Sequence, residues 1–454
     1  MSAPQAKTKR PERGESVELV VDALAYGGRG VARTADGYVV FVQNAIPGDR
    51  VRATLTKRKR HYGEARIEEL LQPSPERIEP VADHPGAAWQ VLPYERQLEI
   101  KAQQVDESLR RIGHLDGYEL RPIVRADEQW RYRNKLEFSF GDSDDDLICG
   151  FHAPGSWETI VAVEDCLLQS EAGNDARRKV LAWARAQGLS AYDRRDQRGL
   201  LRNLVLREGR RTGELQVRLV VTAGENEPDF GTLADAVDCD SLIVTRMADL
   251  GETTAGGDSE LIAGAATIAE RLSGLDFRIG GEAFFQTNTE MAERLYALAS
   301  DAAGLQGWER VYDLFCGIGT ISLVLAARAG EVWGVEIVEE AIADALSNAR
   351  ANDVDNVRFF AGDVRTEMRD LVERAGRPDV VIVDPPRAGL SQKVVRRIIE
   401  SGPSRVVYVS CNPTTLAPNA TQLGEAGYAL KHVQPVDMFP QTPHIECVAL
   451  LERG

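Results

Sequence analysis

The final third of the chain repeats one pattern: a short apolar run that ends near a polar residue and is followed by a stretch of helical length. Such runs cover residues 311–315, 332–335, 357–360, 380–383 and 406–409. Each is short and rich in β-branched or aromatic residues, which favours a buried strand over a helix. Strands that alternate with helices predict an α/β fold with a mostly parallel sheet.

Polar residues close these strands. Glu336 ends the second, Asp363 and Asp384 follow the third and fourth, and Cys411 follows the fifth. An Asn-Pro pair directly after Cys411 stops its strand, because proline has no N–H for the sheet. Open parallel sheets bind ligands at this edge. Each Asp alone could instead cap a helix, and the cysteine alone could be apolar filler. Three acids at successive strand ends make capping a poor explanation for all three.

The first of these strands leads into a glycine turn, Gly317-Ile318-Gly319. Glycines let the backbone approach a ligand, and Glu336, nineteen residues after Gly317, is placed to accept both ribose hydroxyls. The full dinucleotide fingerprint is absent, since Thr320, Ile321 and Ser322 follow. The pattern therefore favours a nucleoside without a pyrophosphate, such as S-adenosylmethionine. Asp363 is then placed to meet the adenine ring, and Asp384 lies near the reacting centre.

Cys411 adds a nucleophile beside a methyl donor. Carbon 5 of a pyrimidine is a poor nucleophile until a thiolate adds at carbon 6. The resulting adduct needs a base to remove the carbon 5 proton, and Glu446 stands directly before the last predicted strand, residues 447–451. The alternative for Glu446 is a surface glutamate at a strand start, although its neighbours Ile445 and Cys447 are apolar.

Charge and composition exclude several classes. The net charge of −16 argues against indiscriminate polyanion binding, although residues 1–80 are slightly basic, with 14 Lys and Arg against 11 Asp and Glu. The tightest basic cluster spans residues 57–62. No apolar run of about 18 residues and no signal peptide is present, and six cysteines form no CxxC pair. We therefore expect a cytoplasmic protein with reduced thiols, no membrane association and a monomeric state.

The rest of the chain divides into four predicted segments. Residues 1–14 form a polar, disordered arm, and 15–72 hold five short strands separated by glycine turns, which predict a small closed barrel of the kind that binds single-stranded nucleic acid. Residues 73–120 form a linker with a helix at 94–112, and 121–275 form a mixed α+β middle domain. Within it, residues 131–135 interleave cationic and aromatic groups, a pattern that suits RNA contact or simply a charged strand start.

The motifs of the final third resemble the RNA uracil-C5 methyltransferase family, and residues 27–31, 36–42 and 46–49 resemble a TRAM domain, an OB-like RNA-binding module. The resemblance rests on five motifs in order: Phe285-Gln286-Thr287-Asn288, residues 313–320, residues 384–389, residues 410–413 and His444-Ile445-Glu446. It implies a Rossmann-like class I methyltransferase domain at 276–454, with Cys411 as the nucleophile, Glu446 as the base and Cys316 as a cofactor-loop residue. The implied residues of the cofactor and target pocket are Gln286, Phe315, Thr320, Glu336, Asp363 and Asp384.

Two departures from the family pattern matter. Members that modify ribosomal RNA often hold an iron–sulfur cluster on four cysteines, but residues 83–90 contain none and only Cys166 matches a ligand. We therefore expect no cluster. Thr320 also stands where the family more often has Asn, so its contact with the cofactor is open.

The expected activity is S-adenosylmethionine-dependent methylation of uridine carbon 5 in RNA, with ribosomal RNA favoured and transfer RNA open. An adenine N-methyltransferase would want an aromatic residue where Arg387 stands, and a cytosine-C5 RNA enzyme would carry a second cysteine near Asp384. A different class, a non-catalytic RNA-binding or ribosome-assembly factor, fits less well because Cys411 and Glu446 are both present.

Overall fold

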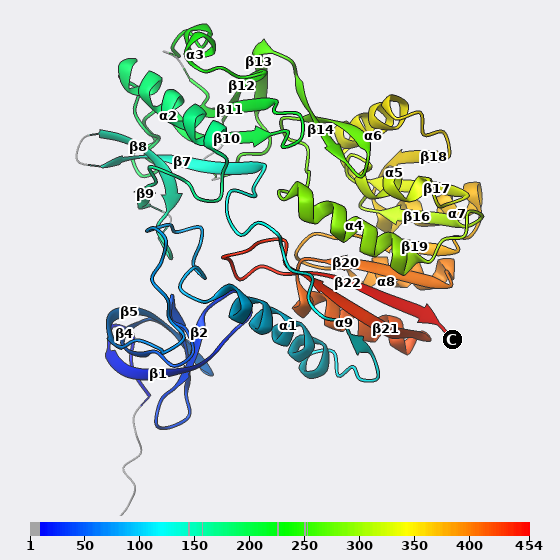
Figure 1. Cartoon of the computed structure of the whole chain (residues 1–454), viewed down its shortest axis with the longest axis horizontal. Coiled ribbons are helices and arrows are strands. Elements are labelled where there is room, and N and C mark those ends of the chain that lie inside the picture. The colour runs from blue at the N-terminus through cyan, green and yellow to red at the C-terminus, as the bar shows by residue number, and fades with distance from the viewer. Residues whose placement is uncertain (1–9, 144–145, 157, 225–226, 249–250, 252) are drawn as a thin grey trace, which may run out of the picture. The chain divides into compact units, whose positions relative to one another are not determined.

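The computed structural model describes residues 10–143, 146–156, 158–224, 227–248, 251 and 253–454 (Figure 1). The chain forms two compact units. The first holds the residues up to Glu107 together with Phe439–Ile445, and the second holds Ser108–Met438 and Glu446–Gly454. Most of the arm predicted at 1–14 lies outside the described residues. Among those described, no helix is long and apolar enough to cross a bilayer.

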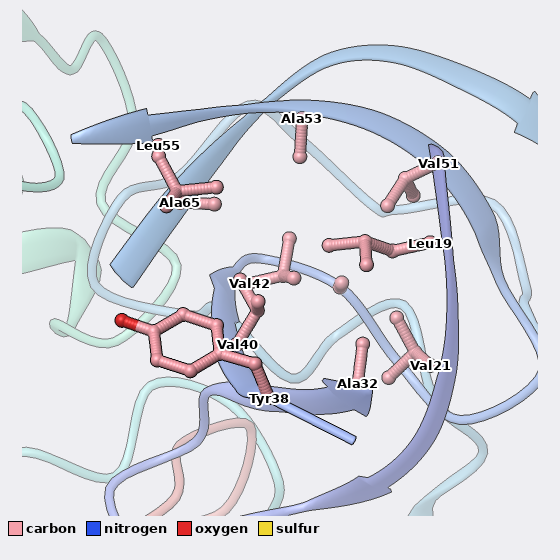
Figure 2. Packing of buried hydrophobic residues seen from close by; sticks show 11 residues of the cluster. Leu19, Val21, Ala32, Tyr38, Val40, Val42, Val51, Ala53, Leu55 and Ala65 are labelled. Carbon is pink, nitrogen blue, oxygen red and sulfur yellow. The ribbon is translucent and has the colours of Figure 1, made fainter. Parts of the chain in front are cut away.

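The first unit contains a closed five-stranded barrel with strand order β1-β2-β3-β5-β4. Its strands are β1 Ser16–Leu24, β2 Gly30–Arg33, β3 Val39–Gln43, β4 Arg50–Arg58 and β5 Tyr62–Gln72. Alternate residues point inward, as a half-buried strand requires. Figure 2 shows the result: Leu19, Val21, Val40, Val42 and Val51 fill the interior. The predicted barrel is confirmed.

Helix α1, Tyr94–Arg111, begins in this unit and matches the predicted helix closely. Leu98, Val105 and Leu109 are buried along one face as predicted. Ile112 is not, because it lies beyond the last helical residue and is 48% exposed.

The second unit contains a seven-stranded sheet with order β13-β12-β11-β10-β7-β8-β9, and all its strand pairs are antiparallel except β11 with β12. Its elements are β7 Lys135–Ser143, β8 Asp146–His152, β9 Ile160–Ala162, α2 Glu171–Ala186, β10 Leu201–Glu208, β11 Leu215–Thr222, α3 Gly231–Ala236, β12 Ser241–Met247 and β13 Asp258–Gly264. A hairpin of β14 Thr267–Leu272 and β15 Leu275–Gly280 follows.

An eight-stranded sheet forms the rest of this unit, with order β18-β17-β16-β19-β20-β22-β21-β6. Its strands are β6 Glu119–Leu120, β16 Arg310–Leu314, β17 Glu331–Glu336, β18 Val357–Ala361, β19 Val380–Val383, β20 Arg405–Ser410, β21 Tyr428–Val436 and β22 Glu446–Arg453. The helices between them are α4 Thr289–Ala303, α5 Thr320–Ala326, α6 Glu339–Ala351, α7 Val364–Ala375, α8 Gln392–Ser401 and α9 Pro413–Glu425. The predicted α/β arrangement is confirmed, and the helices alternate with the strands in Figure 1.

Two features of this sheet indicate where a ligand-binding site lies. The strand order reverses between β16 and β19, which pair in parallel, and ligands bind at such switch points. β22 runs antiparallel between β20 and β21, so its first residues lie beside the last residues of β20.

Candidate active site

Cys411 and Glu446 meet at the carboxyl edge of this sheet. Ser410 ends β20 and pairs with Cys447 of β22, so the residue after the one and the residue before the other are neighbours across the two strands. Cys411 is partly exposed, whereas Glu446 is 3% exposed. These strand pairings therefore place a thiol and a carboxyl side by side at one edge of the sheet.

The turn after Cys411 is fixed by hydrogen bonds. Asn412 is the N-cap of α9 and accepts a hydrogen bond from the Thr414 N–H at 3.0 Å, with Pro413 in the first helical turn. The Asn412 amide also donates to the Arg387 carbonyl at 3.0 Å. The cysteine loop and the loop that follows Asp384 are therefore held together.

The Cys411 thiol and the carboxyl groups of Glu446 and Asp384 lie close enough to disfavour negative charge on one another. Burial raises the pKa of Cys411 to about 12, and the charges of Glu446 and Asp384 act in the same direction. Burial also raises the pKa of Glu446 well above its usual range, with a further contribution from Asp384. Arg387 opposes both shifts. A carboxylate with a raised pKa is a stronger base than an exposed one, which suits removal of a carbon-bound proton.

Asp384 lies directly after β19 and does not cap a helix. Burial raises its pKa to about 7, the neighbouring charge of Asp313 adds to this, and a hydrogen bond from Gln286 lowers it. The Gln286 Nε2 lies 3.5 Å from Asp384 Oδ2. Asp313, in β16, accepts a hydrogen bond from the Ser322 hydroxyl at 2.6 Å, and burial raises its pKa to about 6.

The glycine turn after β16 forms a cradle beside β17. Phe315, at the strand end, has φ +71°, and Gly317 and Gly319 also have positive φ, a backbone that side chains with a Cβ rarely adopt. A Cβ on Gly317 would meet no atom within 4 Å, so its backbone borders open space. The Glu336 carboxylate accepts hydrogen bonds from the N–H groups of Gly317 at 3.3 Å and Ile337 at 2.8 Å.

A cavity of about 240 Å³ lies next to this turn, and Phe315, Glu336 and Asp363 all line it. Ile337, 63% exposed, adds an apolar surface beside Glu336. Backbone close to open space, a carboxylate and an apolar rim are what a nucleoside needs, so these residues fit the adenosine part of S-adenosylmethionine.

Two predicted cofactor residues are engaged with the protein itself. Asp363 is the N-cap of α7 and accepts a hydrogen bond from the Arg365 N–H at 2.8 Å; hydrogen bonds from the Arg365 side chain hold its pKa below the usual range. Asp363 therefore combines the capping role with its place in the cavity. The Thr320 hydroxyl lies 3.3 Å from the Tyr296 hydroxyl in the buried first turn of α5. Cys316 is buried and its pKa is raised well above normal, which makes it an inert thiol.

Reasoning from the sequence missed the electrostatic position of Arg387. The sequence offered one signal, a cation directly after Asp384-Pro385-Pro386, but only the fold turns that cation toward Cys411 and Glu446. Across the described part of the chain, no three His, Cys, Asp or Glu side chains are grouped in a way that would hold a metal ion.

The sheet is mostly parallel, its strand order reverses beside a glycine turn, and a carboxylate stands at the end of β17. These features define the class of protein, which is an S-adenosylmethionine-dependent methyltransferase with an N-terminal TRAM barrel. Residues 258–454 match the family model described as tRNA (Uracil-5-)-methyltransferase, and residues 10–67 match the TRAM domain.

Similar proteins match this chain over nearly its full length. A Halalkalibacterium halodurans protein described as an uncharacterized RNA methyltransferase is 39% identical over 100% of this chain and 99% of its own. A Gloeobacter violaceus protein with the same description is 40% identical over 97% of each. The crystal structure of Pyrococcus abyssi tRNA (uracil-54, C5)-methyltransferase in complex with S-adenosyl-L-homocysteine matches with a TM-score of 0.78, at 29% identity over 96% of this chain and 100% of that one. The chain belongs to the RNA uracil-5-methyltransferase family.

Proposed function

We propose that this enzyme methylates carbon 5 of a uridine in structured RNA through a covalent bond between Cys411 and carbon 6 of the uracil ring. The observation that carries the proposal is the insertion of β22 between β20 and β21, which brings Glu446 beside Cys411. A nucleophile and a buried base at the carboxyl edge of one sheet are the two groups that this reaction needs.

In the proposed mechanism, the Cys411 thiolate adds to carbon 6 and leaves carbon 5 enolate-like. S-adenosylmethionine supplies, when bound, an electrophilic methyl group for carbon 5. The Glu446 carboxylate then takes the carbon 5 proton, the sulfur–carbon 6 bond breaks, and the thiolate is released. Arg387 favours the thiolate and the carboxylate, since its charge lowers the pKa of both groups.

The remaining predicted residues have proposed places around these two. Phe315, Glu336 and Asp363 border the cavity that suits the adenosine moiety, and Thr320 begins the helix after the glycine turn. Gln286 and Asp384 lie toward the reacting centre, where the target base is flipped into the pocket. The barrel at 15–72 and the middle region at 121–275 are proposed to bind the surrounding RNA.

Ribosomal RNA is the favoured substrate because a TRAM domain is present. Transfer RNA is a second candidate, favoured by the Pyrococcus abyssi tRNA (uracil-54, C5)-methyltransferase, which matches this chain over nearly its full length. Mass-spectrometric mapping of 5-methyluridine in ribosomal and transfer RNA from a deletion strain separates the two. If neither RNA lost a modification, the proposed function would be wrong.

Covalent trapping tests the chemistry. RNA that contains 5-fluorouridine has no proton to lose at carbon 5, so the methylated adduct should persist and migrate with the protein in a denaturing gel. Cys411→Ala should abolish trapping, whereas Cys239→Ala, which removes the other partly exposed cysteine of the chain, should leave it unchanged. Trapping that survives Cys411→Ala would refute the proposed nucleophile.

A further inference from the structure

Within the stretch at residues 131–135, predicted to suit RNA contact, Tyr132 and Asn134 are buried and the other three residues are partly exposed. Tyr132 is 1% exposed, so its ring presents no face to a base. Arg131 forms an ion pair with Asp165 at 2.7 Å, and Lys135 pairs with Glu137 at 2.8 Å. Tyr132 and Asn134 therefore contact the interior of the protein.

Asn134 is the residue of this stretch that reaches the Phe285–Asn288 motif. It is 2% exposed, and its backbone N–H donates to the Thr287 carbonyl at 2.7 Å. Its side-chain amide donates to the Gln286 carbonyl and to the Thr289 hydroxyl oxygen, both at 2.9 Å. One buried asparagine thus holds three positions across the start of α4.

The Thr289 hydroxyl is itself fixed by a fully buried carboxylate. It donates to Glu270 at 2.8 Å, and Glu270 also accepts from the N–H groups of Arg210 at 2.9 Å, Arg211 at 3.1 Å and Arg271 at 2.9 Å. The hydroxyl proton is committed to Glu270, so the hydroxyl oxygen faces the Asn134 amide as an acceptor. This arrangement leaves Asn134 little freedom to turn.

The segment that Asn134 holds includes Gln286. The Gln286 Nε2 lies 3.5 Å from Asp384 Oδ2, at the limit of a hydrogen bond. A small displacement of the Gln286 backbone would break this contact. The flanking residues do not replace Asn134. Phe285 packs against Phe277 with ring centroids 6.0 Å apart, and Asn288 caps α4, but neither bonds to the Gln286 carbonyl.

We propose that Asn134 is a positioning residue for the active site: by holding the backbone at Gln286 it aligns the Gln286 amide with Asp384 on the target side of the pocket. The inference rests on the proposed function only for its effect on catalysis. The alignment itself is a property of the folded protein.

A double-mutant cycle tests the catalytic effect. Asn134→Ala should slow trapping of 5-fluorouridine RNA about 10- to 100-fold, the loss that a misplacement of about 1 Å produces. In a Gln286→Ala background the same change should cost less than twofold, because the residue through which Asn134 acts is gone. The control is Asn174→Ala, which also removes a buried amide with several backbone partners but lies in α2 and touches no predicted site residue. Its effect should be equal in both backgrounds.

Titration of Asp384 tests the alignment without any reaction. The Gln286 hydrogen bond lowers the pKa of Asp384, so Asn134→Ala should raise that pKa in the same direction as Gln286→Ala, and Asn174→Ala should not. Asp313, Glu446, Cys411, Tyr296 and Tyr408 also face or interact with Asp384 and are the same in all variants. Carbon-13 NMR of labelled aspartate, assigned with Asp384→Asn, gives the readout.

The outcomes separate the two proposals. If the wild-type protein never traps RNA, the proposed function fails, and the titration still decides the role of Asn134. If Asn134→Ala leaves the pKa of Asp384 unchanged, or if its effect on trapping multiplies with that of Gln286→Ala, the inference is overturned. Should Asn134→Ala fail to fold, Asn134→Ser, which keeps one hydroxyl donor, is judged by the same two criteria.

Discussion

Glu446→Gln provides the sharpest test of the proposed chemistry, because the two halves of the reaction should respond in opposite ways. The substitution keeps the size of a side chain that is 3% exposed and removes its charge and basicity. The charge of Glu446 raises the pKa of Cys411, so its loss should leave thiolate addition intact or faster. Proton removal from carbon 5 loses its base.

The size of the second effect follows from the burial of Glu446. A positioned general base contributes about 10²–10⁴-fold, or roughly 2.7–5.5 kcal/mol of barrier. Because Glu446 is enclosed, bulk water has poor access to replace it, and we expect a loss toward the upper end. Asp384, with a pKa of about 7, is a neighbouring carboxyl that could take over. The double variant Glu446→Gln, Asp384→Asn tests whether Asp384 takes over as the base.

The assay is single-turnover methylation with ordinary uridine RNA, which separates the adduct from the free product on a denaturing gel. The wild-type enzyme should show only a transient adduct, and Glu446→Gln should accumulate a methylated adduct while releasing product at least 10²-fold more slowly. Product release within tenfold of the wild-type rate, with no accumulated adduct, would refute the assignment of Glu446 as the base.

Three further predictions concern charge. Arg387→Gln should slow trapping at pH 7 about tenfold, which corresponds to about 1.4 kcal/mol, because Arg387 lowers the pKa of Cys411. The difference in trapping rate between the variant and the wild type should shrink as the pH rises. A difference that does not depend on pH would indicate that Arg387 contacts the RNA instead. Turnover of the wild-type enzyme, measured from pH 6 to 9, should rise with pH because the pKa values of Cys411 and Glu446 are both raised and both groups act deprotonated; a flat profile would contradict this. Asp49→Asn should destabilise the barrel by about 3 kcal/mol in thermal or urea unfolding, because the Asp49 carboxylate is fully buried and accepts hydrogen bonds from Arg77 and two backbone N–H groups. Although burial acts to raise the pKa of Asp49, these donors hold it below 3.8. The contribution of Asp49 to the stability of the barrel should therefore be present above pH 3.8 and lost as the pH falls further. Equal unfolding of the variant and the wild type at neutral pH would contradict this role of Asp49.

The strands of the barrel and most strands of the C-terminal sheet could be predicted from the sequence, although β21 was not among them. Alternating apolar residues and glycine turns specified the barrel strands, and the Asn-Pro pair after Cys411 specified both the end of β20 and the start of α9. The polar strand ends also indicated the correct edge of the sheet. These features depend on residues close together in the chain, and so local propensity and periodicity reveal them.

The tertiary structure alone decided which of those residues meet. Glu446 lies beside Cys411 only because β22 pairs antiparallel between β20 and β21, a choice among strand partners that no local pattern records. Long-range packing likewise buried Tyr132, which local charge and aromatic content had suggested for RNA, and turned Asn134 toward Gln286. Sequence periodicity shows that one face of an element is apolar, but the identity of the residues that cover it is fixed when distant segments pack together.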